Sequence, residues 1–340
     1  MEVLKISKDD FRSFVQKKIE NSDQRTIGVV KKGSHFAYAD LESVDDMQMD
    51  YNVTMLPPKK YFQPPKEILL KFKPKDASSY VAVNQCDKIA LIGVHYYDLA
   101  SLFLMDKAFS EGERDEHYMK KRENSIMVGM YPTKYFKYRF AKSVLRDQAY
   151  KVADVMLVDM GDDYVVEVVS KKGKEYIDGG NFVENNYSLL DIDEAKNKVK
   201  DDQRIPVPIE LIPEYLVKNH GHKVWEDFGE KCFSCGSCVL VCPTCYCFDV
   251  SEEVELSLQD GTRVRTWDGC MLEDFAVCGD GHNFRKEKGS RFRHRMFRKG
   301  KGLPEKFHSF GCVGCGRCAY SCPSDIAGPV KILKYMEDNK

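Results

Sequence analysis

The chain has 340 residues, which is enough for two domains, because a single hydrophobic core rarely grows beyond about 250 to 300 residues. Its net charge is −1, which excludes an overall attraction to nucleic acid or to an anionic membrane. The first residues lack the features of a signal peptide, and no run of about eighteen apolar residues occurs, so we expect a cytoplasmic protein without membrane insertion.

Residues 1–200 are predicted to form a mixed α/β domain. The helical spacing of apolar residues predicts helices over 10–20 and 98–109. Short apolar runs predict buried strands at 88–94 and 153–159. The strand at 88–94 leads directly into the helix at 98–109, as in a βα unit, so a doubly wound sheet is one possible topology.

Two further segments precede the cysteine-rich part of the chain. The pattern of 162–177 is typical of a β-hairpin that turns at Lys172 and Gly173. The segment 201–228 contains three prolines and then a short helical pattern, which predicts a linker with a helix. The remaining residues, 229–340, are predicted to form the second domain.

Cysteine is concentrated in this second domain, where 12 of the 13 cysteines follow residue 231. In a long chain without a signal peptide, such clustering indicates metal binding rather than a disulfide framework. Eight of the cysteines fall into two copies of the pattern C-x2-C-x2-C-x3-C-P, which is the spacing of bacterial two-cluster ferredoxins. The first copy comprises Cys232, Cys235, Cys238 and Cys242, and the second comprises Cys312, Cys315, Cys318 and Cys322.

This spacing predicts two [4Fe–4S] clusters with crossed ligands, because the fourth cysteine of each copy binds the other cluster. One cluster is assigned to Cys232, Cys235, Cys238 and Cys322, and the other to Cys312, Cys315, Cys318 and Cys242. The loop glycines are expected to adopt positive φ angles and to leave backbone N–H groups free for the clusters: Gly236, Gly314 and Gly316. Zinc is the alternative, but paired C-x2-C zinc sites have no use for a third cysteine followed by Cys-Pro.

The predicted fold class is therefore α+β, with an N-terminal mixed α/β domain followed by a C-terminal two-cluster ferredoxin-like domain. A long insert separates the two cysteine motifs. It contains four further cysteines, which form a possible third metal site: Cys245, Cys247, Cys270 and Cys278. The alternative is that these four are buried thiols, since free cysteine is among the most buried residue types.

The insert also holds a basic segment, residues 285–302, with nine Lys or Arg. Interleaved aromatic residues are compatible with nucleic-acid binding. In a neutral chain, however, one short basic segment favours a solvated face or a docking patch for an acidic protein partner. Positive charge near anionic clusters would also stabilise their reduced forms.

Several segments are characteristic beyond the cysteine spacing: 57–72, 91–109, 153–168, 232–250, 263–275, 281–299 and 312–323. CPTCYCFDV (242–250) and WDGC (267–270) are the most specific of them. Together they resemble the iron–sulfur beta subunits of soluble cytoplasmic [NiFe] hydrogenases, also called sulfhydrogenases, which are related to one of the subunits of anaerobic sulfite reductase. The resemblance extends over most of the chain.

This resemblance implies an electron relay. A flavoprotein partner would take electrons from NAD(P)H through FAD, and the two clusters would pass them to or from a catalytic redox subunit. The chain would then be an electron-transfer subunit without catalytic residues of its own and without a nucleic-acid partner. The alternative function is a reductase in its own right, with flavin or substrate bound by the N-terminal domain.

Overall fold

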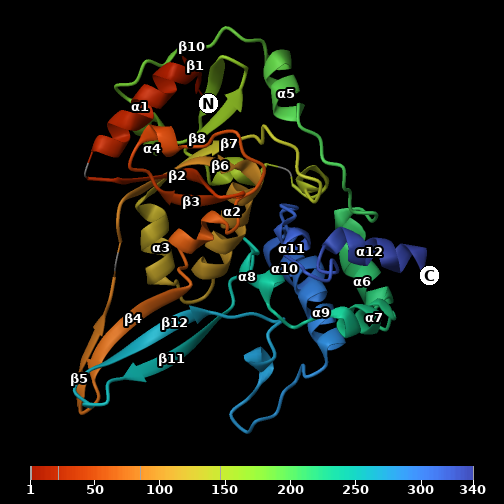
Figure 1. Cartoon of the computed structure of the whole chain (residues 1–340). Coiled ribbons are helices and arrows are strands. Elements are labelled where there is room, and N and C mark those ends of the chain that lie inside the picture. Colours follow the sequence, from red (N-terminus) through yellow and green to blue (C-terminus); the bar gives the residue numbers. More distant parts are fainter. Residues whose placement is uncertain (1, 22, 85, 146, 340) are drawn as a thin grey trace.

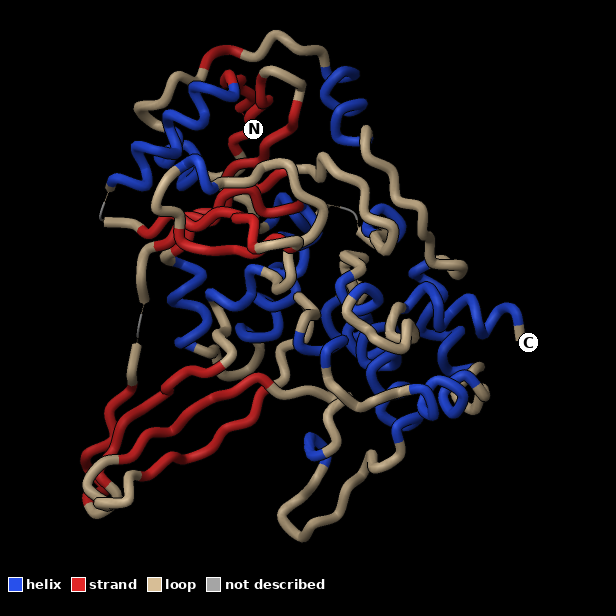
Figure 2. Tube along the Cα trace, viewed as in Figure 1, coloured by secondary structure: helices blue, strands red, loops and turns tan. Residues whose placement is uncertain are grey.

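The computed structural model describes residues 2–21, 23–84, 86–145 and 147–339. Helices and strands are mixed, in agreement with the predicted α+β class. Three parts are visible in Figures 1 and 2: a large sheet with its covering helices, a β-arm that projects from it, and a helical region that carries the cysteine motifs. No helix among the described residues is long and apolar enough to cross a membrane.

The large sheet has eight strands in the order β10-β1-β9-β8-β7-β6-β2-β3. The neighbours β2, β6, β7 and β8 run parallel, and the other pairs in the sheet are antiparallel. Every residue of β6 is buried, as expected for a central parallel strand. The bounds are β1 Glu2–Ser7, β2 Arg25–Lys32, β3 His35–Asp40, β6 Ile89–His95, β7 Ser125–Met130, β8 Val155–Asp159, β9 Asp163–Val168 and β10 Val183–Glu184.

The two helices and the two buried strands predicted in this part are confirmed. The expected helices correspond to α1 (Lys8–Glu20) and α2 (Tyr96–Ser110), and the expected strands to β6 and β8. Because β6 leads through α2 to the parallel strand β7, the βα unit is present. Three shorter helices belong to the same part: α3 Glu116–Glu123, α4 Lys171–Ile177 and α5 Leu189–Asn197.

The hairpin predicted at 162–177 is wrong. Its first half is β9, but its second half is the helix α4. The Ser170 hydroxyl accepts a hydrogen bond from the Gly173 N–H at 3.0 Å, which caps a helix at the point where a turn was expected. A Cβ at Gly173 would lie 2.1 Å from the Asp154 carbonyl oxygen, so glycine serves close packing here rather than a hairpin turn.

The β-arm is a four-stranded antiparallel sheet in the order β11-β12-β4-β5 (Figure 1). Its strands are β4 Lys66–Lys73, β5 Asp76–Ala82, β11 Phe248–Val254 and β12 Gly261–Trp267. Two strands come from the N-terminal part of the chain and two from the insert between the cysteine motifs. The arm therefore joins segments that lie about two hundred residues apart along the chain.

The cysteine motifs lie among short helices with their own apolar core, which includes Ile212, Trp225, Phe292 and Leu333. The segment 201–228 contributes to this core through α6 and the start of α7. The helices are α6 Ile212–Lys218, α7 Val224–Lys231, α8 Ser237–Leu240, α9 Lys288–Phe297, α10 Leu303–Phe307, α11 Arg317–Tyr320 and α12 Pro329–Asp338, with a π-helical turn at Arg298–Gly302. Short 3-10 turns occur at Val44–Asp46, Pro58–Tyr61, Ala141–Ser143, Gln148–Lys151, Ile209–Leu211 and Asp274–Ala276.

Candidate metal centres

The two cysteine motifs share one backbone conformation. In each motif the residue two positions after the first cysteine has a positive φ, 54° at Ser234 and 67° at Gly314. The residue after the second cysteine does the same, with φ 72° at Gly236 and 80° at Gly316. These left-handed residues turn the chain so that a short helix, α8 or α11, follows in each motif. The expected positive φ angles at the three loop glycines are thus confirmed.

The first set of predicted ligands lies around one cavity. This narrow cavity, of about 20 Å³, is lined by Cys232, Cys235, Cys238 and Cys322. The last of these comes from the second motif, so the structure brings together the crossed set that the spacing predicts. Met271 and Phe292 close the same cavity with apolar side chains.

The second set is buried more deeply. Cys315 and Cys318 are buried, and Cys312 is half-buried. Cys312 and Cys315 each lie close enough to Cys242 and Cys318 for their charges to interact. The structure therefore also brings Cys242, from the first motif, to the three cysteines of the second.

The chemistry of these donors fits iron–sulfur clusters. Burial raises the pKa of the Cys238 thiol and of the Cys312 thiol to about 12, so neither loses its proton readily without a compensating cation. Bound iron supplies that positive charge and the redox chemistry. Eight thiols in two sets of four are the donors that two [4Fe–4S] clusters require.

Buried cations lie among the cysteines. The Lys299 ammonium donates hydrogen bonds to the Cys242 sulfur at 3.2 Å, to the Thr244 hydroxyl at 2.7 Å and to the Gly311 carbonyl at 3.1 Å. A hydrogen bond from Cys245 lowers the pKa of Cys242, and Lys299 acts in the same direction. Within the part of the chain that the structure describes, no carboxylate forms an ion pair with Lys299, so its charge is directed at the cysteines.

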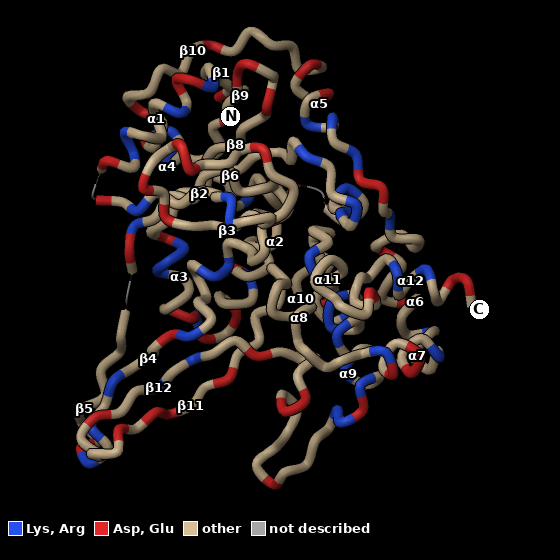
Figure 3. Tube along the Cα trace, in the orientation of Figure 1, with Lys and Arg blue, Asp and Glu red and all other residues tan. Residues whose placement is uncertain are grey.

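The basic segment 285–302 is therefore only partly a solvated face, which corrects the prediction. Arg291, Arg295 and Lys299 are buried, because their spacing of four residues places them on the inner face of α9 and of the π-helical turn. The segment's other cations remain at or near the surface, and charges of both signs are spread over the rest of the chain (Figure 3).

A buried ion pair connects the second motif to the large sheet. The guanidinium of Arg317, between Cys315 and Cys318, donates to the Asp98 carboxylate at 2.5 and 2.7 Å. It also donates to the Thr54 carbonyl at 2.8 Å and to the Thr54 hydroxyl at 2.7 Å. Because Asp98 lies in the first turn of α2, this pair fixes the second motif against the N-terminal part of the chain.

Comparisons with known proteins agree with this geometry. A family model described as a 4Fe-4S dicluster domain matches residues 231–326, which include all eight motif cysteines. The sulfhydrogenase 2 subunit beta of Pyrococcus furiosus is 31% identical over 319 residues, and the match covers 92% of each chain. The chain belongs to the family of sulfhydrogenase beta subunits. No solved structure matches it.

As a sulfhydrogenase beta subunit with a dicluster domain, the chain carries two [4Fe–4S] clusters and is an electron-transfer subunit of a multi-subunit complex. The cysteines that surround the first cavity and those of the second set are the residues that would hold these clusters. Which sulfur binds which cluster stays a prediction.

The two cysteine sets differ in exposure. Cys235 is exposed, and the side chain of its neighbour Phe233 is 72% exposed. Near the second set, the half-exposed Tyr320 at the end of α11 packs with Phe136 at a ring distance of 5.6 Å and with Tyr138 at 5.9 Å. Each set is therefore close to a different aromatic patch.

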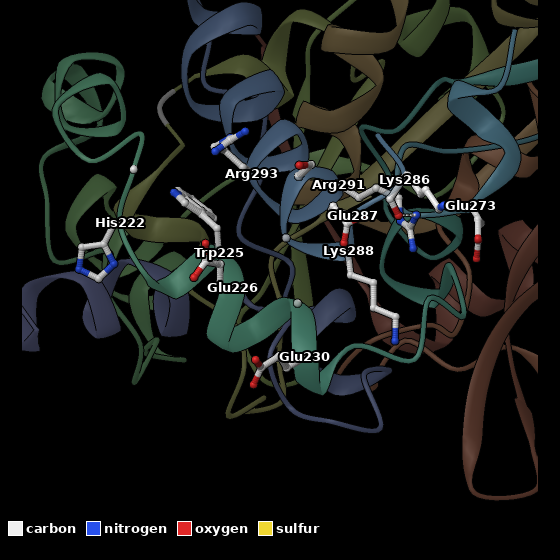
Figure 4. A pocket seen from close by; sticks show the side chains of 14 residues that line it. His222, Trp225, Glu226, Glu230, Glu273, Lys286, Glu287, Lys288, Arg291 and Arg293 are labelled. Carbon is white, nitrogen blue, oxygen red and sulfur yellow. Dashed lines mark hydrogen bonds between the residues drawn. The ribbon is translucent and has the colours of Figure 1, made fainter. Parts of the chain in front are cut away.

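A groove of about 630 Å³ lies between α7 and α9 (Figure 4). Glu226 and Glu230 line it from α7, and Lys288 and Arg293 line it from α9. Arg291, at the same groove, donates a hydrogen bond to the Ser234 hydroxyl at 2.8 Å, within the first cysteine loop. Charges of both signs line the groove. The hydrogen bond from Arg291 to Ser234 supports the cysteine loop of the first set.

The four additional cysteines are not all together. Cys245, Cys247 and Cys270 line one cavity of about 240 Å³, whereas Cys278 is exposed and is not among the residues that line it. Sequence reasoning singled out these cysteines but missed the other polar groups of this cavity, His294 among them. A single histidine within a basic segment matches no metal-ligand spacing, so the sequence does not identify His294 as a ligand.

Proposed function

We propose that the chain relays electrons between a flavoprotein subunit, which takes them from NAD(P)H, and a catalytic redox subunit. The observation that supports this most is the placement of the two cysteine sets. They lie in one helical region; the first set reaches the surface at Cys235, and the second set is buried next to a different group of aromatic side chains. A relay needs such an arrangement, with one centre for the donor and another for the acceptor.

The first patch consists of Cys235 and Phe233. An exposed aromatic side chain beside a cluster ligand offers a partner apolar contact area at the point of electron transfer. The surrounding loop is held by Arg291 through its hydrogen bond to Ser234. A partner that docks here would face a rigid first cluster.

The second patch consists of Tyr138 and Tyr320, which pack on the buried ring of Phe136. Tyr320 is 50% exposed and lies between two cysteines of the second motif, Cys318 and Cys322. Tyrosine is enriched at protein interfaces because its ring is large and its hydroxyl tolerates water. A partner that docks here would face the second cluster.

Anaerobic isolation of the tagged chain from its own cells tests this function. We expect recovery of a flavin-containing subunit and of a metal-containing catalytic subunit. Phe233→Asp should lose one of these partners and Tyr320→Asp the other, because each variant places a charge in one patch. Leu189→Asp is the matched control, since Leu189 is 83% exposed on α5, and it should retain both partners.

Two results would count against the proposal. If the chain were recovered alone, with bound flavin and turnover of a substrate, it would be a reductase in its own right. If both patch variants kept both partners, the partners would dock elsewhere. Iron content should be measured in every variant, so that loss of a partner is not confused with loss of a cluster.

A further inference from the structure

Three cysteines outside the ferredoxin motifs converge because of the β-arm. Cys247 precedes β11, and Cys270 follows β12 by three residues. The antiparallel pairing of β11 with β12 matches Phe248 with Trp267, so the end of β12 lies beside the start of β11. The Asp268 N–H donates to the Cys247 carbonyl at 3.3 Å, so the base of the hairpin is closed. Cys270 thereby meets Cys245 and Cys247 across a cavity.

The thiols in this cavity differ in burial and in hydrogen bonding. Cys270 is buried, and Cys245 and Cys247 are half-buried. Among the described residues, neither the Cys247 thiol nor the Cys270 thiol has a hydrogen-bond partner. The cavity of about 240 Å³ is far wider than the one at the first cysteine set. It is therefore roomy enough for more than a water molecule.

The positive charges around the cavity favour an anionic occupant. Arg295, Arg298 and Lys299 line it, and no Asp or Glu is among its lining residues. Arg295 is 1% exposed, and its Nε atom has no hydrogen-bond partner. Buried cations that are close together are costly unless negative charge accompanies them. Thiolates that bind an iron–sulfur cluster would supply that charge.

We propose that this cavity holds a third [4Fe–4S] cluster, bound by Cys245, Cys247 and Cys270. The imidazole of His294, on α9, is the fourth ligand. His294 lines the cavity, and neither of its ring nitrogens has a hydrogen-bond partner in the described part of the chain.

The third centre would contact both others. Cys270 lies close enough to Cys238, of the first set, for their charges to interact. On the other side, the Cys245 sulfur lies within hydrogen-bond distance of the sulfur of Cys242, which belongs to the second set. Lys299 lines the cavity and also donates to Cys242. A cluster here would therefore connect the two predicted centres within the chain.

Iron counting and Mössbauer spectroscopy on the anaerobically produced full chain test this assignment. We expect about twelve cluster irons per chain, because each [4Fe–4S] cluster contributes four. The triple variant Cys245→Ser, Cys247→Ser, Cys270→Ser should lose about four of them. Cys278→Ser is the matched control and should lose none, because Cys278 does not line the cavity.

His294→Cys provides a test that does not depend on the triple variant folding. It should keep the full iron content and lower the reduction potential of one cluster signal, because thiolate replaces the more electron-poor imidazole. A wild-type count of about eight irons would overturn the third cluster. So would a full count in the triple variant. An unchanged set of potentials in His294→Cys would overturn the role of His294.

Discussion

Lys299 is the residue with the most direct electrostatic effect on the second cysteine set. Its ammonium is buried and donates to the Cys242 sulfur. Reduction adds negative charge to a cluster, so a neighbouring cation stabilises the reduced form more than the oxidised form. Positive charge near the clusters was expected from the sequence, but the residue that supplies it here could not be identified without the structure.

We predict that Lys299→Met lowers the reduction potential of the second cluster by about 60 mV, equivalent to about 1.4 kcal/mol for one electron. The physical reason is the loss of the charge and of the hydrogen bond to Cys242. An anaerobic redox titration followed by EPR measures the shift. Lys301→Met is the control, because Lys301 pairs with the exposed Glu305 on the outer side of the same turn. Equal potentials in the two variants would contradict the prediction.

Two independent features of the structure require glycine at position 316. Its φ is 80°, and a Cβ there would lie 2.6 Å from the Tyr138 carbonyl oxygen. We predict that Gly316→Ala lowers stability by about 2 to 4 kcal/mol, from backbone strain together with the clash. Gly112→Ala, at φ 64° with open space around it, should cost only about 1 kcal/mol.

The loss of cluster absorbance on heating under anaerobic conditions compares these two glycine variants. Gly316→Ala should lose its clusters at a clearly lower temperature than Gly112→Ala. If both variants lost their clusters at the same temperature, the close approach to Tyr138 would not contribute to stability. The positive φ of Gly316 was predictable from its place in the motif, whereas its contact with a distant loop was not.

At the scale of elements, the pair Asp98–Arg317 joins α2 to α11. Both side chains are at most 2% exposed. We predict that Asp98→Asn lowers stability by about 3 to 5 kcal/mol, because it leaves a buried guanidinium without its counter-charge. Asp45→Asn is the control, since Asp45 forms an exposed ion pair with Arg12 that is worth about 1 kcal/mol or less.

Thermal unfolding of the two aspartate variants distinguishes a structural joint from an incidental contact. A large difference between them is expected. A double variant, Asp98→Asn with Arg317→Gln, should lose less stability than the sum of the losses in the two single variants, because no isolated charge remains buried. Strict additivity would show that the pair does not act as a unit.

Elements with a clear local pattern were predictable. The apolar run of β6 and the helical stripe of α2 identified their structures from the sequence alone. The hairpin at 162–177 was not predicted correctly, because the cap formed by Ser170 outweighed the turn signal of Lys172 and Gly173. A segment can fit two local patterns, and packing against distant parts of the chain then determines which structure it adopts.

At the scale of the whole molecule, the candidate site was predictable where ligands follow a fixed spacing. The structure brings Cys322 to the first set and Cys242 to the second, as that spacing predicts. The cavity around Cys270 was not predictable, because it depends on β12 pairing with β11 and with the distant strand β4. Such long-range pairing leaves no mark in any single segment.

On the scale of the whole molecule, the helical region carries both cysteine sets, and Arg317 joins that region to α2 beside the large sheet. In the proposed relay, electron flow depends on the clusters, and the exposed Cys235 belongs to the first of the two proposed docking patches.

The most direct test is the rate of electron transfer from the flavoprotein partner to the catalytic subunit in the intact anaerobic complex. With Cys235→Ala, we expect this rate to fall to the value measured without the chain, while each partner keeps its own activity with artificial dyes. Cys278→Ala, a second exposed cysteine, should leave the rate unchanged. A complex with Cys235→Ala that transfers electrons at the wild-type rate would contradict the relay.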